Sequence, residues 1–150
     1  MKRKKLTASM IALVMSVSLP MTTYAANWYL EDGSVTVNAD NSGQTVTQGG
    51  TSTPDEAPVI TQRESSVETG NTIGISTSDN ATANVTIKDI NIKSSKDAID
   101  VTGSSSANIT LEGDNKIFSE TGSALHISDG NVTINGSGSL KAEIQDEPSG

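Results

Sequence analysis

The sequence contains no cysteine, which excludes disulfide bonds and any redox or metal site based on thiolates. Aromatic residues make up only 3% of its 150 residues, and His126 is the single histidine. The shortage of aromatic residues disfavours an immunoglobulin-like sandwich, and one histidine without cysteine partners makes a poor zinc site. His126 stands between Leu125 and Ile127, so we expect it to point outward from a strand as a surface residue.

Basic residues are scarce beyond the start of the chain. Four of the ten occur in Lys2–Lys5, which precedes the mostly apolar stretch Leu6–Leu19 and the small residue Ala25. This order is typical of a secretory signal peptide, and the apolar stretch is too short for a stable membrane anchor. We predict a signal peptide over residues 1–25, cleavage before Ala26, and a secreted protein that is extracellular or associated with the cell surface.

Removal of the signal peptide leaves six basic and 18 acidic residues, a net charge of −12. An electrostatic field of this sign disfavours nucleic acid and anionic lipid as partners, and it can attract divalent cations. We therefore expect no nucleic-acid partner, and no membrane partner once the signal peptide has been removed.

A four-residue phrase occurs three times in the second half of the sequence. Its copies are Asn84–Ile87, Asn108–Leu111 and Asn131–Ile134, and the interval between successive copies is nearly constant. Polar and aliphatic residues alternate in each copy, which is the period of a strand with one buried face. A repeat of this length built on short strands is typical of a solenoid. The sequence predicts an all-β right-handed parallel β-helix, or β-solenoid, with about three short strands per coil.

Residues 26–150 form the predicted solenoid domain. Residues 48–58 are rich in Gly, Ser, Thr and Pro and are predicted to be a loop or small insertion. The regular coils are expected over residues 72–141, and a frayed polar tail over residues 145–150. Strands of neighbouring coils would run parallel, about 4.8 Å apart.

Stacking the three copies of the phrase places their equivalent positions in ranks, with apolar side chains inward and polar ones outward. An antiparallel sandwich of short strands is the alternative, but the near-constant coil length favours the solenoid. The predicted inward ranks are Val85–Ile109–Val132 and Ile87–Leu111–Ile134, and the outward ranks are Asn84–Asn108–Asn131 and Thr86–Thr110–Thr133.

The signal sequence, the segment Trp28–Ser34 and the Asn-Val-Thr-Ile coils together resemble secreted clostridial-type carbohydrate-binding domain proteins. The resemblance covers most of residues 27–141. It implies a right-handed parallel β-helix related to the polysaccharide-lyase fold, and a noncatalytic polysaccharide-binding protein. Proteins of this group usually continue through further Gly-rich coils, whereas this sequence stops at Gly150, so the resemblance favours a truncated chain.

Candidate sugar ligands are the outward polar ranks and the aromatic residues near the start of the mature chain. An aromatic ring can stack on a sugar face, but it can equally cap the open end of a solenoid. The candidates are Asn84, Thr86, Asn108, Thr110, Asn131 and Thr133, with Trp28 and Tyr29.

Aspartates near predicted turns offer hard oxygen ligands, which suit calcium better than softer metals. The sequence has no Asp-x-Asp-x-Asp loop, and solvated turn residues are the alternative interpretation. The candidate calcium ligands are Asp89, Asp97, Asp100 and Asp114.

Catalysis has little support in the sequence. Lyase chemistry needs a base that removes a proton beside a carboxylate. Arg63 is the only arginine of the mature chain, and no basic residue accompanies an acidic cluster at a recognisable spacing. We expect no enzyme activity.

A structural or adhesive surface protein is the alternative to a sugar-binding one. The last coil contains Val132, Ile134 and Leu140, and the tail offers only Ala142 and Ile144 to cover it. Unpaired strand edges are open to another chain, so we expect self-association through the C-terminal coil.

Overall fold

The computed structural model describes residues 25–146 and is all-β apart from one 3-10 helix, η1 (Leu30–Asp32). The chain forms a parallel β-solenoid of about three turns, as the repeat predicts. The predicted signal peptide up to residue 24 and the last four residues of the predicted tail lie outside the described residues. Within residues 25–146, no helix has the length and apolar character needed to cross a membrane.

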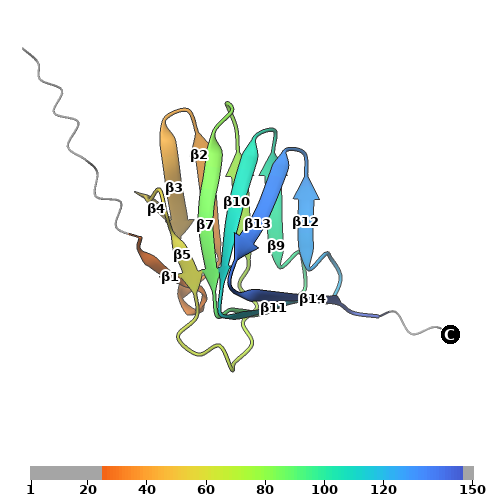
Figure 1. Ribbon diagram of the computed structural model, residues 1–150. Helices are drawn as coiled ribbons and strands as arrows, with labels where there is room; N and C mark the ends of the chain where they lie inside the picture. Colours follow the sequence, from red (N-terminus) through yellow and green to blue (C-terminus); the bar gives the residue numbers. More distant parts are fainter. Residues whose placement is uncertain (1–24, 147–150) are drawn as a thin grey trace, which may run out of the picture.

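From residue 82 on, successive strands belong to three sheets in the repeating order A, C, B, and Figure 1 shows these sheets as the sides of the solenoid. Sheet A comprises β1 (Asn27–Tyr29), β5 (Val59–Thr61), β7 (Thr82–Lys88), β10 (Ser106–Glu112) and β13 (Asn131–Gly136). Sheet C comprises β8 (Asn91–Ser94), β11 (Asp114–Ser119) and β14 (Ser139–Ile144). Sheet B comprises β2 (Val35–Asp40), β3 (Gly43–Gln48), β4 (Thr51–Pro54), β6 (Ile73–Thr77), β9 (Ile99–Gly103) and β12 (Leu125–Ser128).

The core fills the space between the three sheets. Alternate residues of each strand point into it, because successive side chains of a strand lie on opposite faces. Ile109 of sheet A, Ile117 of sheet C and Val101 of sheet B are each at most 3% exposed. The apolar positions of the first two repeat copies therefore face inward, as predicted.

The predicted stacking of the third repeat copy is wrong by two residues. Asn108 pairs with Asn84 as expected, but on its other side it pairs with Thr133 rather than Asn131. Every position of β10 is displaced along β13 in the same way, so Ile134 stacks on Ile109 and Val132 on Ala107. The prediction aligned equivalent positions of the repeated phrase, whereas the observed backbone pairing depends on the length of the turns between the strands.

The predicted loop at residues 48–58 contains a strand. β4 pairs antiparallel with β3, and β3 pairs antiparallel with β2, so the region is a β-hairpin added to the edge of sheet B. The buried Gln44 fastens this hairpin to sheet A, because its side-chain amide donates to the carbonyl of Asn84 at 3.0 Å and accepts from the Asn84 N–H at 2.8 Å. All four residues of β4 are exposed, so the strand has no buried apolar face from which it could have been predicted.

One corner between sheets A and C is fixed by a buried asparagine. The Asn115 side chain accepts from Ile90 N–H at 3.2 Å and donates to the carbonyls of Glu112 and Ser139, each at 3.0 Å. These partners belong to three successive coils. Asn115 therefore satisfies the buried Ile90 N–H and links the backbones of these coils.

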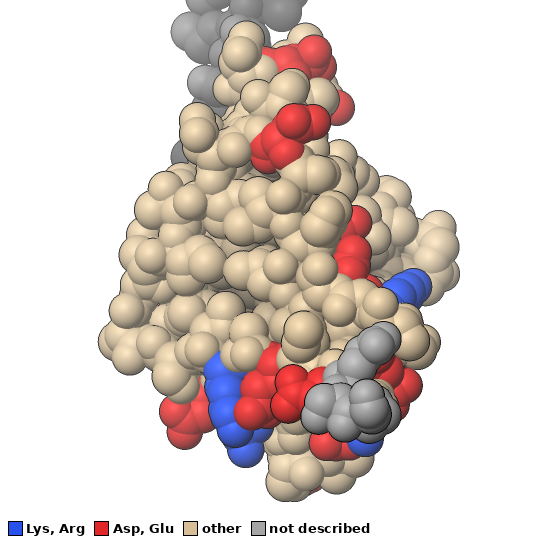
Figure 2. Space-filling view, turned by 90° about the vertical axis from the view of Figure 1, so that its right-hand side faces the viewer, with Lys and Arg blue, Asp and Glu red and all other residues tan. Residues whose placement is uncertain are grey.

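The two ends of the solenoid differ. At the N-terminal end Leu30 is fully buried and Trp28 packs against the core. At the C-terminal end Ile127, Ile134 and Ile144 are 44%, 42% and 58% exposed. Figure 2 looks at this end and shows charged side chains gathered along its lower edge, with most of the remaining face uncharged.

Candidate functional site

The predicted polar ranks of sheet A do lie on its outer face, with the corrected stacking. The Asn108 side-chain amide donates to Asn84 Oδ1 at 3.1 Å, and the Thr110 hydroxyl donates to Asn135 Oδ1 at 3.2 Å. Thr86 pairs with Thr110, whereas Asn131 and Thr133 are displaced by two residues from their predicted partners. Part of the hydrogen-bonding capacity of these residues is therefore used between coils.

The two candidate aromatic residues lie on β1, at the edge of sheet A. Trp28 Nε1 donates to Asp55 Oδ2 at 2.8 Å, and the Arg63 guanidinium lies 4.0 Å from the centre of the Tyr29 ring. Arg63 also forms an ion pair with Asp32 at 2.7 Å, and this contact lowers the pKa of Asp32. Both rings thus have partners within the chain, and the packing of Trp28 on the core matches a cap.

The four candidate calcium ligands do not form one cluster. Asp89 and Asp114 occupy the corner between sheets A and C, where Asp89 Oδ1 accepts from the Asp114 N–H at 3.2 Å. Asp89 has a φ of 49°, a left-handed conformation that aspartate tolerates well in turns. Asp97 lies just before β9 and Asp100 lies within it, so both belong to sheet B or to the turn that leads into it.

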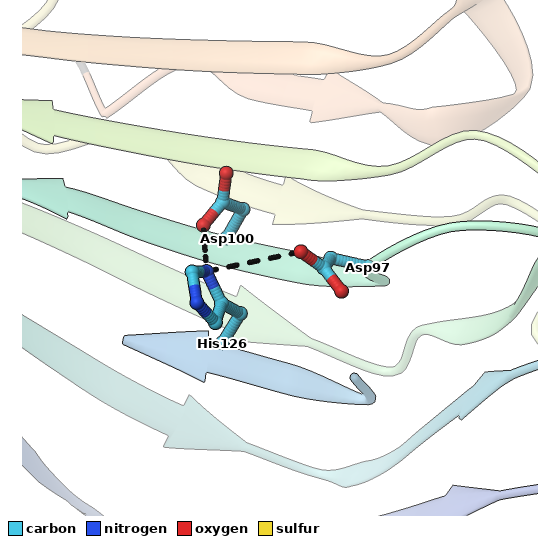
Figure 3. A group of neighbouring side chains, drawn as sticks. All are labelled: Asp97, Asp100 and His126. Carbon is cyan, nitrogen blue, oxygen red and sulfur yellow. Dashed lines mark hydrogen bonds and ion pairs between the residues drawn. The ribbon is translucent and has the colours of Figure 1, made fainter. Parts of the chain in front are cut away.

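Asp97 and Asp100 converge instead on His126 of β12, in the next coil (Figure 3). His126 Nδ1 lies 2.8 Å from Asp100 Oδ1 and 3.7 Å from Asp97 Oδ2. One donor atom from each of the three side chains lies within 4.8 Å of the others, and no other such group of three occurs within residues 25–146. His126 is a surface residue, as predicted, with 44% of its side chain exposed.

Two neighbouring carboxylates alter the chemistry of the imidazole. The hydrogen bond that the ring donates to Asp100, supported by the charges of Asp100 and Asp97, raises the pKa of His126. Asp97 is held in place by its other oxygen, Oδ1, which accepts from the Ser123 N–H at 2.6 Å. The second oxygen of Asp97 is thereby directed toward His126.

A groove of about 280 Å³ runs beside this cluster across the outer face of sheet B. Thr36, Gly74 and Asp100 are paired side by side across β2, β6 and β9. Because Gly74 has no side chain, the rank that leads to Asp100 has a gap. The groove is lined by Ser34, Val35, Thr36, Thr72, Ile73, Gly74, Lys96, Asp97 and Asp100.

The outer face of sheet C forms a second concave surface. A groove of about 430 Å³ lies between Ser65–Ser66 and sheet C, where Lys116 and Lys141 pair across β11 and β14. A smaller groove of about 200 Å³ shares Lys116 and reaches the half-buried ring of Phe118. We call this surface, with Lys93, Lys116, Phe118 and Lys141 as its members, the sheet C face.

Neither the role of His126 nor the sheet C face was predicted from the sequence. Two signals were present. His126 follows Asp100 at about the length of one coil, and lysine recurs at positions 93, 116 and 141 at a similar interval. Neither interval lies within the repeated phrase, so the phrase alone could not reveal them.

Comparison of the chain with protein-family models, with curated proteins and with solved structures finds no match.

Proposed function

We propose that the protein is a secreted, noncatalytic β-solenoid that binds polysaccharide on the sheet C face. The signal-like N-terminus supports export, and the resemblance of the coils to carbohydrate-binding β-helix proteins supports a sugar ligand. The observation on which the proposal chiefly rests is the outward position of Phe118 in the smaller groove, which shares Lys116 with the larger one.

Phe118 offers what the outer face of sheet A lacks, an apolar surface on which the C–H groups of a sugar ring can pack. Lys93 Nζ lies over this ring, 5.8 Å from its centre, so a hydrogen-bond donor is close to the apolar surface. Lys93 is also 4.0 Å from Glu68, and Lys141 is 2.9 Å from Glu143. Within residues 25–146 Lys116 forms no ion pair, which leaves its ammonium group available to sugar hydroxyls.

The size and position of the larger groove fit this function. Its volume of about 430 Å³ falls in the range of small-ligand pockets, roughly 300–1,000 Å³. Its polar lining includes the Asp114 carboxylate, the Ser139 hydroxyl and the ammonium groups of two lysines. A chain of sugar units can lie along the sheet while one ring packs on Phe118.

A glycan screen followed by titration of single variants tests the proposal. Phe118→Ala should weaken binding by about tenfold, equivalent to about 1.4 kcal/mol. Thr110→Ala, an outward substitution on β10 of sheet A, is the matched control and should change the affinity by less than about twofold. Loss at Thr110 with no loss at Phe118 would place the sugar on sheet A. Absence of binding to any plant, host or bacterial glycan would contradict the function itself.

A structural or adhesive role is the second candidate. Its support is the exposed C-terminal end of the solenoid, where Ile127, Ile134 and Ile144 lie on three different strands. Each of these strands, β12, β13 and β14, is paired on one side only within the described residues. Such an end can add further coils or other subunits, as expected of a scaffold.

A further inference from the structure

We propose that Asp97, Asp100 and His126 form a binding site for one divalent first-row transition-metal ion, with Zn²⁺ as its representative. This proposal is independent of sugar binding. The three side chains come from two coils and meet only because β9 and β12 pair in parallel, with Asp100 directly opposite His126.

The spacing of the donor atoms suits such an ion. Zn²⁺ binds nitrogen and oxygen at about 2.0–2.2 Å, so tetrahedral ligands lie about 3.4 Å apart. The distance from His126 Nδ1 to Asp97 Oδ2 is 3.7 Å, close to this value. The hydrogen-bonded distance from Nδ1 to Asp100 Oδ1 is 2.8 Å, and it must widen by about half an ångström when the ion replaces the shared proton. All three side chains are partly exposed and can make this adjustment.

The donor types select the class of metal. One imidazole nitrogen and two carboxylate oxygens suit Zn²⁺ and its first-row neighbours, whereas Ca²⁺ requires six to eight oxygen ligands. Two carboxylates also neutralise a divalent cation. Three protein ligands leave a coordination position for water or for a ligand oxygen, as in open zinc sites.

Neighbouring groups orient one of the three ligands before an ion binds, and they leave the site open to solvent. The Ser123 N–H fixes Asp97 Oδ1 at 2.6 Å, which restricts the orientation of the carboxylate before an ion arrives. The gap at Gly74 keeps the groove open beside Asp100. An ion and its water ligand can therefore enter from the face of sheet B.

Isothermal titration calorimetry of the purified protein with Zn²⁺ tests the proposal. We expect about one ion per chain, and a loss of affinity of at least about tenfold in His126→Gln and in the double variant Asp97→Asn/Asp100→Asn. The double variant Asp89→Asn/Asp114→Asn is the matched control, because it removes the same charge at another corner. It should keep its affinity within about twofold.

A second measurement avoids dependence on the folding of any variant. His126 is the only histidine, so its ring gives a single set of imidazole signals in the NMR spectrum. Substoichiometric Mn²⁺ should broaden these signals selectively in the unmodified protein. The proposal is overturned if Mn²⁺ leaves them sharp, if Zn²⁺ binds equally well to His126→Gln, or if Ca²⁺ binds at the same site as tightly as Zn²⁺.

Discussion

His126 and Asp100 face each other across neighbouring coils, with the imidazole Nδ1 2.8 Å from the carboxylate Oδ1. A carboxylate accepts hydrogen bonds, so Nδ1 holds the proton and donates it. The positive form of the ring is stabilised further by Asp97, and the pKa of His126 is raised for these reasons. An NMR titration of the metal-free protein should give a pKa above about 6.5, and Asp100→Asn should lower it. An unchanged pKa in Asp100→Asn would show that the hydrogen bond is not maintained in solution.

The same contact predicts how stability depends on pH. Because the pKa of His126 is higher in the folded than in the unfolded chain, the folded state binds more protons between these two values. The stabilisation is fully present below the unfolded pKa and is lost as the pH rises through the folded pKa. Urea unfolding of the parent protein and of His126→Gln should therefore differ more below about pH 6.5 than at alkaline pH. A difference that grows with increasing pH would contradict this sign.

The position of a side chain along the solenoid determines the cost of its removal. Ile109 is 2% exposed and lies between Val85 and Ile134 in the neighbouring coils. Ile109→Ala should lower the free energy of unfolding by about 2–5 kcal/mol. Ile134 occupies the same rank but is 42% exposed because no described coil follows it, so Ile134→Ala should cost less than about 1 kcal/mol. Equal losses in denaturant unfolding would mean that the terminal coil is covered in solution.

The sequence predicted the solenoid because its strand period and its coil period are both visible in the repeated phrase. It could not predict the register of the third coil, because a shift of two residues keeps every side chain on the same face of the strand. The predicted and the observed pairing of β13 with β10 therefore satisfy the same alternation. Only the pairing of Asn108 with Thr133 decides between them.

The candidate site was predictable only in part, for a related reason. Asp97 and Asp100 were recognised as oxygen ligands, but their partner His126 lies one coil away, and a single histidine has no pattern of its own. The surface position of Phe118 could not be predicted from the sequence, since an isolated aromatic residue is more often assigned to the core. Its pairing with the outward Lys93 and Glu143 across sheet C places it on the surface.

Two glycines of sheet B should respond differently to a methyl group. Gly103 has a φ of 107°, and a Cβ built there would lie 1.9 Å from the Thr77 carbonyl oxygen. Gly103→Ala should therefore destabilise the fold by about 1–3 kcal/mol. At Gly74 the nearest atom to an added Cβ is Thr36 Oγ1 at 3.7 Å, so Gly74→Ala should change stability by less than about 1 kcal/mol. Thermal unfolding of the two variants checks this contrast, and similar losses would contradict the backbone geometry at residue 103.

The C-terminal end of the solenoid should associate with a second copy of the chain. Ile127 of β12 and Ile134 of β13 are exposed there, and both strands have unpaired backbone groups on their outer sides within the described residues. Apolar side chains beside free strand edges form a surface that favours strand addition. At the N-terminal end Trp28 packs on the core, and within the described residues no large apolar side chain of β1 or of the hairpin strands is exposed.

Analytical ultracentrifugation over a range of protein concentrations measures this association. The apparent mass should rise with concentration, and Ile127→Lys or Ile134→Lys should suppress the rise by placing a charge in the contact. Val67→Lys is the control, because Val67 is 62% exposed but lies in a loop away from the terminal strands. A strictly monomeric protein at high concentration would show that the exposed end does not bind another copy. Equal suppression by Val67→Lys would show that the effect of lysine is one of overall charge rather than of this surface.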